Sequence, residues 1–266
     1  MKNFSLDTNW ISNQIREFAY CLHNDETNIF EGNGHFIDGK KQTVHLMKID
    51  NCRDLKVRDV IFRNGNTGII KNIPRNQISF PQKKTSIFEI IDGGAVVITG
   101  RSNVTFENCQ FIGNKSIMCG GAISNQGTGI VKIRNCLFEN NIAGHTGAAV
   151  DNLTKHANVE VVDSRFIDNI SNQWLRTGAP HGQISVFPNT KASIINCSFH
   201  KGSVPFDYYQ DSTIQFKDNT YTGFDHWSES LSKRQAITLL DLMNIFKNLY
   251  WIAPKTIGKV YYRVNP

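Results

Sequence analysis

Five residues in the second half of the chain have the chemistry to move protons on an acidic sugar. Arg176 can neutralise the carboxylate beside C5 of a sugar acid, which makes the C5 proton easier to remove. His145 or His181 can take that proton, and Tyr209 or a water molecule can protonate the leaving oxygen. Asp151 adds a carboxylate to the set. Together these residues predict the chemistry of a lyase or an epimerase.

Four further residues are candidates for substrate binding, namely Trp174, Lys84, Lys115 and Asp207. Asp207 also has a second interpretation, because hydrolysis of a neutral sugar needs two carboxylates. Asp151 with Asp207 is the pair that we would test for that reaction. Hydrolysis is the less favoured alternative.

Each candidate also has a purely structural interpretation. His145 would be a solvated histidine in a polar loop, and Asp151 a turn residue whose carboxylate binds backbone N–H groups. His181 would shape a turn between Pro180 and Gly182, and Tyr209 would shield the last repeat. Arg176 and Trp174 would fold their long loop back onto the rest of the protein.

A repeated sequence motif, called the aromatic phrase below, predicts the strands that must position these residues. It is seen in FENCQFIGN, IRNCLFENN, VVDSRFIDN and IINCSFHKG, with fainter copies at VRDVIFRNG and FKDNTYTGF. Beyond Phe111 its aromatic position recurs every 22 to 33 residues, whereas the 49 residues from Phe62 to Phe111 leave room for one elaborated repeat or two. The aromatic position is occupied by Phe62, Phe111, Phe138, Phe166, Phe199 and Tyr221. A fixed period of this length indicates a solenoid.

Each repeat predicts three short strands. Apolar residues alternate before an Asn or Asp, and the alternation then resumes with a shifted phase, which describes a strand that bends into another strand. A third strand is predicted at HLMKID, SIFEII, GGAISN, GAAVDN, GQISVF and VPFDYY. Three strands per coil give a single-stranded right-handed parallel β-helix of about seven coils, an all-β solenoid with the aromatic residues stacked inside.

Two coil sequences carry a family resemblance. FIGNKSIMCGGAISN and FENNIAGHTGAAVDN resemble the FxxN…GGAI coil consensus of right-handed parallel β-helix proteins, which include the polymorphic membrane proteins of chlamydiae and the pectate-lyase-like superfamily. GNGHFIDG is similar to an early coil of pectate-lyase-like proteins, and the resemblance covers roughly residues 28–223. It implies the fold but no single function, because the superfamily includes lyases, hydrolases, epimerases, adhesins and phage tailspikes.

Helical caps are predicted at both ends. Residues 7–24 place apolar side chains such as Trp10, Ile15, Phe18 and Leu22 on one helical face, as a cap over the first coil would require. We therefore predict a cap helix in residues 1–27, the β-helix in residues 28–227, and a helical cap with a terminal strand in residues 228–266. The C-terminal helix is also a candidate element for forming a homo-oligomer.

Composition narrows the classes of partner. The net charge is +6, yet no arginine-rich tract or nucleic-acid motif accompanies it, so we expect no nucleic-acid partner. No apolar run is long enough to insert into a membrane, and the N-terminal sequence lacks the apolar core of a secretion signal, so we expect a cytoplasmic protein, with export by an unusual route left open. The spacing of the six cysteines matches no zinc motif. We expect free cysteines that fill the core, no metal and no cofactor.

The loops determine where a functional site can form. Nearly all insertions fall after the aromatic phrase, at residues 65–86, 115–119, 142–146 and 170–181, and stacked coils would gather them into one wall. The sequence predicts a carbohydrate-active enzyme, with an anionic sugar chain bound in a groove beside the GGAI-type strands. The alternatives are an intracellular β-helix enzyme acting on a small non-polymeric substrate, and a non-catalytic solenoid that binds a glycan or another partner.

Overall fold

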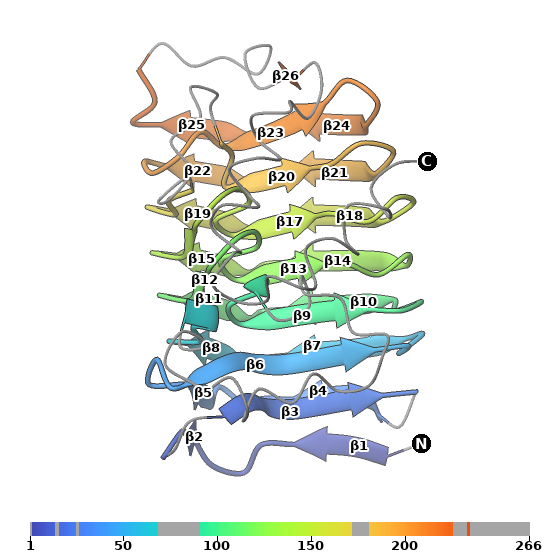
Figure 1. Ribbon diagram of the computed structural model, residues 1–266, viewed down its shortest axis with the longest axis vertical. Helices are drawn as coiled ribbons and strands as arrows, with labels where there is room; N and C mark the ends of the chain where they lie inside the picture. Colours follow the sequence, from blue (N-terminus) through green and yellow to red (C-terminus); the bar gives the residue numbers. More distant parts are fainter. Residues whose placement is uncertain are drawn as a thin grey trace, which may run out of the picture.

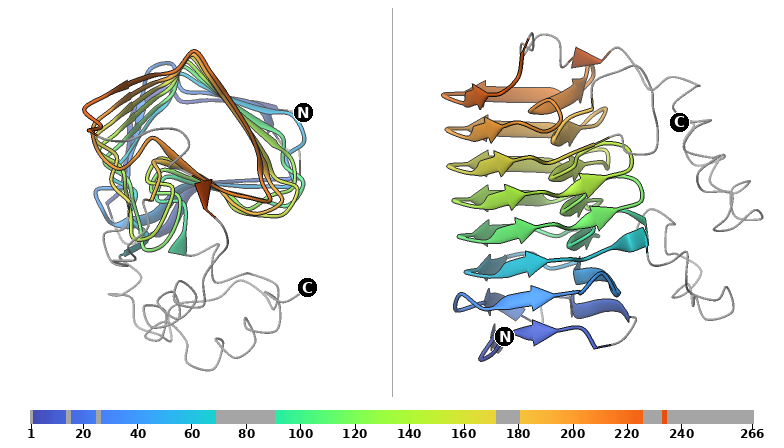
Figure 2. Two further views of the ribbon diagram at one scale, coloured as in Figure 1. Left: turned by 90° about the horizontal axis from the view of Figure 1, so that it is seen from above. Right: turned by 90° about the vertical axis from the view of Figure 1, so that its left-hand side faces the viewer.

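The computed structural model describes residues 2–13, 16–24, 27–68, 91–171, 181–225 and 233–234. In these residues every paired strand is parallel to its neighbours, and the strands form three eight-stranded sheets and one two-stranded sheet. Figure 1 shows the strands stacked in layers from the blue N-terminal end to the orange end, and the coils overlie one another when seen along the stack in Figure 2. The architecture is a parallel β-helix, as predicted.

Each coil contributes one strand to each large sheet. Sheet A contains β1 (Lys2–Ser5), β4 (Thr27–Glu31), β7 (Leu55–Arg58), β10 (Val104–Glu107), β14 (Ile130–Arg134), β18 (Asn158–Val162), β21 (Lys191–Ile195) and β24 (Thr213–Lys217). Sheet B contains β2 (Trp10–Ile11), β5 (Phe36–Asp38), β8 (Ile61–Arg63), β11 (Gln110–Ile112), β15 (Leu137–Glu139), β19 (Arg165–Ile167), β22 (Ser198–His200) and β25 (Thr220–Thr222).

Sheet C carries the GGAI-type strands. It contains β3 (Arg16–His23), β6 (Thr43–Asp50), β9 (Val96–Thr99), β13 (Ile123–Asn125), β17 (Val150–Asn152), β20 (Ile184–Val186), β23 (Phe206–Tyr209) and β26 (Lys233–Arg234). A short fourth sheet joins β12 (Lys115–Ser116) to β16 (Ile142–Ala143) between sheets B and C. The described strands fill eight coils rather than about seven. Phe62 pairs directly with Phe111, so the long gap between them belongs to one elaborated coil.

The stacked aromatic column is confirmed. Neighbouring rings from Phe62 to Phe199 lie 4.7 to 5.1 Å apart between centroids, with nearly parallel planes, and all five phenylalanines are fully buried. Burial of each ring stabilises the fold by about 1.5–3 kcal/mol, and the stacking adds to that. The column therefore helps to hold neighbouring coils in register.

The predicted bend and the cysteine rung are also confirmed. The Asn or Asp between sheets A and B has a positive φ in each repeat, for example 54° at Asn108 and 49° at Asn135. The Asn135 side-chain amide donates to Asn108 Oδ1 over 2.8 Å, which links the bends of successive coils. Cys109 and Cys136 are free and buried, and their Sγ atoms lie 3.4 and 3.7 Å from the Val57 and Phe106 carbonyl oxygens of the coil before.

A second asparagine ladder turns the chain from sheet B towards sheet C. The Asn114 Nδ2 donates to Asn141 Oδ1 over 3.0 Å, and Asn141 Nδ2 donates to Asn169 Oδ1 over 2.9 Å. All three asparagines are fully buried, so these bonds satisfy polar groups that would otherwise be costly inside the protein. The ladder holds the loops that follow it in register.

The predicted N-terminal cap helix is wrong. Residues 2–5, 10–11 and 16–23 form the strands of the first coil, and Phe18, Tyr20 and Leu22 align with β6. The apolar positions in this stretch fit an alternating pattern as well as a helical one, and pairing with β6 selects the strand. Coils therefore begin within the segment assigned to the cap. Apart from Lys233–Arg234, the predicted C-terminal cap lies outside the described residues.

No helix in the described part of the chain is both long and apolar enough to cross a membrane.

Candidate functional site

The candidate site lies on the outer side of sheet C, where two columns of side chains run along the solenoid. The first column follows the centres of the strands, and its members pair one to the next across the coils. It consists of Lys48, Val97, Ser124, Asp151, Ser185 and Asp207. The last four are fully buried. The groove that the sequence predicted along this face is therefore covered at these residues.

The second column occupies the bend just before each strand. Asp92, Cys119, Thr146 and His181 each directly precede a glycine in their coil. Backbone hydrogen bonds align these bends, because Gly93 N–H donates to the Cys119 carbonyl and Gly120 N–H to the Thr146 carbonyl. A different polar group thus occupies the same bend position in four successive coils.

Glycine at the bend allows the two columns to touch. Gly120 has a φ of +64°, a conformation that side chains rarely adopt, and a Cβ there would overlap Asp151 Oδ1. The Asp151 carboxyl consequently lies directly against the bend that carries Cys119. This close approach brings Asp151, from the centre of its strand, next to the bend residues Asp92 and Cys119.

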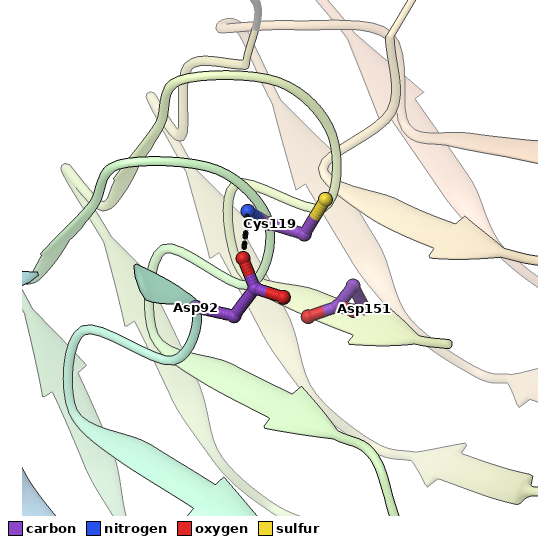
Figure 3. A group of neighbouring side chains, drawn as sticks. All are labelled: Asp92, Cys119 and Asp151. Carbon is purple, nitrogen blue, oxygen red and sulfur yellow. Dashed lines mark hydrogen bonds between the residues drawn. The ribbon is translucent and has the colours of Figure 1, made fainter. Parts of the chain in front are cut away.

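Among the described residues, Asp92, Cys119 and Asp151 bring three side chains that can bind a metal ion close together on this face (Figure 3). One oxygen of each carboxyl group and the sulfur all lie within 4.8 Å of one another, and all three residues are buried. The Cys119 backbone N–H donates to Asp92 Oδ1 over 2.8 Å, and the Thr146 hydroxyl donates to Cys119 Sγ over 3.4 Å. We call these three residues the Asp–Cys–Asp cluster.

Burial dominates the electrostatics of this cluster. It raises the pKa of Asp92 to about 8, and it raises the pKa values of Cys119 and Asp151 well above their usual range. The neighbouring Asp92 charge raises the pKa of Asp151 further, and the Ser124 hydroxyl offsets part of this. Neither Asp151 oxygen receives a hydrogen bond of normal geometry. Burial therefore favours the protonated forms of these three groups unless another charge compensates them.

The two predicted histidines lie together beside the cluster. The rings of His145 and His181 are 4.9 Å apart between centroids, and each residue is at most 4% exposed. His145 Nδ1 is 3.7 Å from Cys119 Sγ. Gly182, which follows His181, donates its N–H to Asp207 Oδ1 over 2.8 Å, and the Ser185 hydroxyl donates to the same oxygen. The fold thus gathers His145, His181, Asp151 and Asp207 on one face.

The other sequence candidates occupy other strand positions or lie outside the described residues. Tyr209 is two residues beyond Asp207 on β23 and packs against Phe187, with 5.6 Å between ring centroids. Lys115 begins β12 and is half-buried. Arg176, Trp174 and Lys84 lie outside the described residues.

Sequence reasoning missed Asp92 and Cys119. The sequence predicts SIFEII as the third strand of the elaborated coil, whereas the strand in sheet C is Val96–Thr99, which directly follows DGGA. Aligning DGGAV with CGGAI and TGAAV would have placed Asp92, Cys119 and Thr146 at one position. The signal was therefore present in the sequence, in the residue before each glycine.

Comparison with known proteins agrees with the architecture. A family model described as a right-handed β-helix region matches residues 70–221. No curated protein sequence and no solved structure gave a match. Since the family match spans more than half of the 266 residues and the sheets are parallel, this chain belongs to the right-handed β-helix family.

Proposed function

We propose that this protein is a carbohydrate-active enzyme that removes a proton from carbon in an anionic sugar, as lyases and epimerases do. The observation that carries the proposal is the pairing of His145 with His181 on the outer side of sheet C, 4.9 Å apart between ring centroids. Asp151 and Asp207 occupy the neighbouring column. Imidazoles are the side chains best suited to accept and return protons near neutral pH.

The proposed chemistry starts at the carbon beside the substrate carboxylate. One imidazole takes the C5 proton, and the electron pair left behind forms the C4–C5 double bond as the C4–O bond breaks. The departing oxygen then takes a proton from the second imidazole or from water, which completes a lyase reaction. In an epimerase the carbon instead receives a proton on its opposite face.

Asp207 has a positioning role in this proposal. Its Oδ1 accepts hydrogen bonds from Gly182 N–H and from the Ser185 hydroxyl, which fixes the bend that carries His181. Lys115, together with Arg176, Trp174 and Lys84 from outside the described residues, would bind the anionic sugar. Tyr209 would take part only if the bound substrate extended further along β23.

Burial of the site favours a small substrate. His145 and His181 are 2% and 4% exposed, and Asp151 is fully buried. An internal segment of a long polymer needs an open groove, whereas a small sugar acid or a chain end needs only a local opening. This supports the smaller substrate over the polymeric one.

The test follows the C5 hydrogen in a panel of uronates and their 4-linked oligosaccharides in deuterated water by nuclear magnetic resonance. An epimerase replaces this hydrogen with deuterium, whereas a lyase removes it and forms the C4–C5 double bond, so loss of the C5–H signal reports either reaction. We expect this loss with at least one substrate, and at least a hundredfold slower loss in His145→Gln or His181→Gln. His200→Gln is the matched control, because His200 is exposed on sheet B.

The outcomes separate an enzyme from a binding module. Binding of a sugar without exchange or cleavage of any uronate or neutral oligosaccharide would identify a non-catalytic module. Full activity in both histidine variants would place the reaction elsewhere on the protein.

A further inference from the structure

We propose that Asp92, Cys119 and Asp151 form a binding site for a divalent transition-metal ion, with Zn²⁺ as the best match. The three residues come from three successive coils, and their ligand atoms lie within 4.8 Å of one another (Figure 3). This inference does not rest on the proposed enzymatic function. It also explains why no metal motif is visible in the sequence, since the donors are brought together by stacking rather than by local spacing.

The independent observation is the state of Asp151. Its side chain is fully buried, neither carboxylate oxygen has a hydrogen-bond partner of normal geometry, and Figure 3 shows the carboxyl aimed at Asp92. Among the described residues neither Asp92 nor Asp151 forms an ion pair. A buried carboxylate without a partner is costly, and a bound cation removes that cost.

The donor set selects the class of metal. A thiolate is a soft ligand that favours zinc and similar transition metals, whereas calcium and magnesium take oxygen ligands. Zn–S and Zn–O bonds of about 2.3 and 2.1 Å in a tetrahedron place the donors about 3.4–3.6 Å apart. The present separations are within 4.8 Å, so closure requires movements of about 1 Å in the side chains.

The surroundings of the cluster resemble the outer shell of a metal site. The Thr146 hydroxyl donates to Cys119 Sγ, which stabilises a thiolate, and the Cys119 N–H holds Asp92 Oδ1. His145 Nδ1 is 3.7 Å from Cys119 Sγ, close to the separation of two donors around one zinc ion. His145 is therefore a candidate fourth donor, although its ring nitrogens lie outside the group of atoms that are all within 4.8 Å of one another. Otherwise the fourth position is left to water or substrate.

The experiment measures metal uptake by the full chain rather than activity. Protein carrying Cys21→Ser, which removes the exposed cysteine, is stripped with chelator and dialysed against Zn²⁺ or Co²⁺. We expect about one metal ion per chain and, with cobalt, a thiolate-to-metal charge-transfer band in the near ultraviolet. Cys119→Thr and Asp151→Ser should each weaken binding at least tenfold.

The repeat itself supplies substitutions that the fold accepts. Threonine already occupies the Cys119 position one coil later, at Thr146, and serine flanks Asp151 in its column at Ser124 and Ser185. Cys136→Ser and Asp163→Asn are the matched controls, since Ser164 occupies the Cys136 rung and asparagine is common at the Asp163 bend. Both controls should bind metal as the parent protein does.

Two results would overturn the metal site. One is a folded, stripped parent protein that takes up neither metal, or takes up cobalt without the thiolate band. The other is undiminished binding by Cys119→Thr and Asp151→Ser. If circular dichroism shows that these two variants are unfolded, the cobalt spectrum of the parent protein decides alone.

Discussion

The phenylalanine column inside sheet B and the strand-centre column on the outer side of sheet C run along the same coils. They differ in how much the residue type changes from one coil to the next. The inner column of sheet B repeats phenylalanine at Phe62, Phe111, Phe138, Phe166 and Phe199. The outer column of sheet C changes at almost every coil, through Val97, Ser124, Asp151, Ser185 and Asp207. The repeated phenylalanines inside the solenoid favour stacking, because stacking needs side chains of the same shape at a fixed spacing. Variation on the outer side places unlike chemical groups beside one another, as a site requires.

The inner column should show the largest effect on stability. Phe138→Ala removes a buried ring that stacks on Phe111 and Phe166, so we expect the free energy of unfolding to fall by about 3–5 kcal/mol. Urea denaturation followed by circular dichroism measures this. Leu137→Ala on the same strand is the control, because Leu137 is half-buried and points away from the core. A loss below about 1 kcal/mol for Phe138→Ala would contradict the importance of the stack.

In the outer column of sheet C, one substitution should raise the free energy of unfolding instead of lowering it. Asp151→Ser removes a buried carboxyl that receives no hydrogen bond of normal geometry, so in chelator we expect the free energy of unfolding to rise by about 1 kcal/mol. Asp207→Ser should instead lower it by about 1–2 kcal/mol, since Asp207 Oδ1 accepts two hydrogen bonds. Urea denaturation of both variants tests the contrast. With saturating zinc the parent protein should become more stable than Asp151→Ser. Equal losses of unfolding free energy for Asp151→Ser and Asp207→Ser in chelator would contradict the predicted difference between the two aspartates.

The smallest expected effect is a pH dependence of stability that comes from Asp38, a carboxylate with several hydrogen-bond partners. Burial alone would raise the pKa of Asp38, but hydrogen bonds from Asn64, the Lys40 backbone and Arg63 outweigh burial, and the pKa is lowered. The unfolded chain therefore takes up the proton first as the pH falls. The stabilisation is present above the unfolded value of about 3.9 and disappears as the pH falls through the lower folded value.

Acid unfolding of Asp38→Asn checks this sign. The parent protein should lose stability more steeply than the variant below about pH 4, and the variant should be the less stable of the two at pH 7. Parallel acid-unfolding curves would show that Asp38 contributes nothing to the pH dependence. Together with Asp151→Ser, this measurement compares a paired and an unpaired aspartate in one solenoid.

Much of the fold could be predicted because each coil repeats the same local pattern. Alternating apolar residues and the Asn or Asp bends, such as Asn108 and Asn135, predicted the strands and the stacked aromatic column. The segment around Phe18 and Tyr20 was predicted wrongly because helical and alternating patterns coincide there over a short stretch. Pairing with β6 decided between them, and pairing is a tertiary contact.

The candidate site could be predicted only in part. The sequence predicted a site beside the GGAI-type strands, and His145 and His181, which come from separate loops, lie side by side there. Asp92 was missed because its partners lie in other coils and the inserted segment before it obscured the register. Burial of Asp151 was likewise not visible, since a polar residue in a turn motif is usually exposed.

The amino-acid sequence by itself determined the parallel β-helix and the identity of its inner columns, because these depend on patterns that recur within each coil. Only the tertiary structure decided that Asp92, Cys119 and Asp151 meet, and that they meet away from water. The reason is physical: stacking brings residues that are 27 and 32 positions apart in the sequence onto neighbouring coils, with a strand spacing of about 4.8 Å, and the pKa values and ligand geometry depend on that distance.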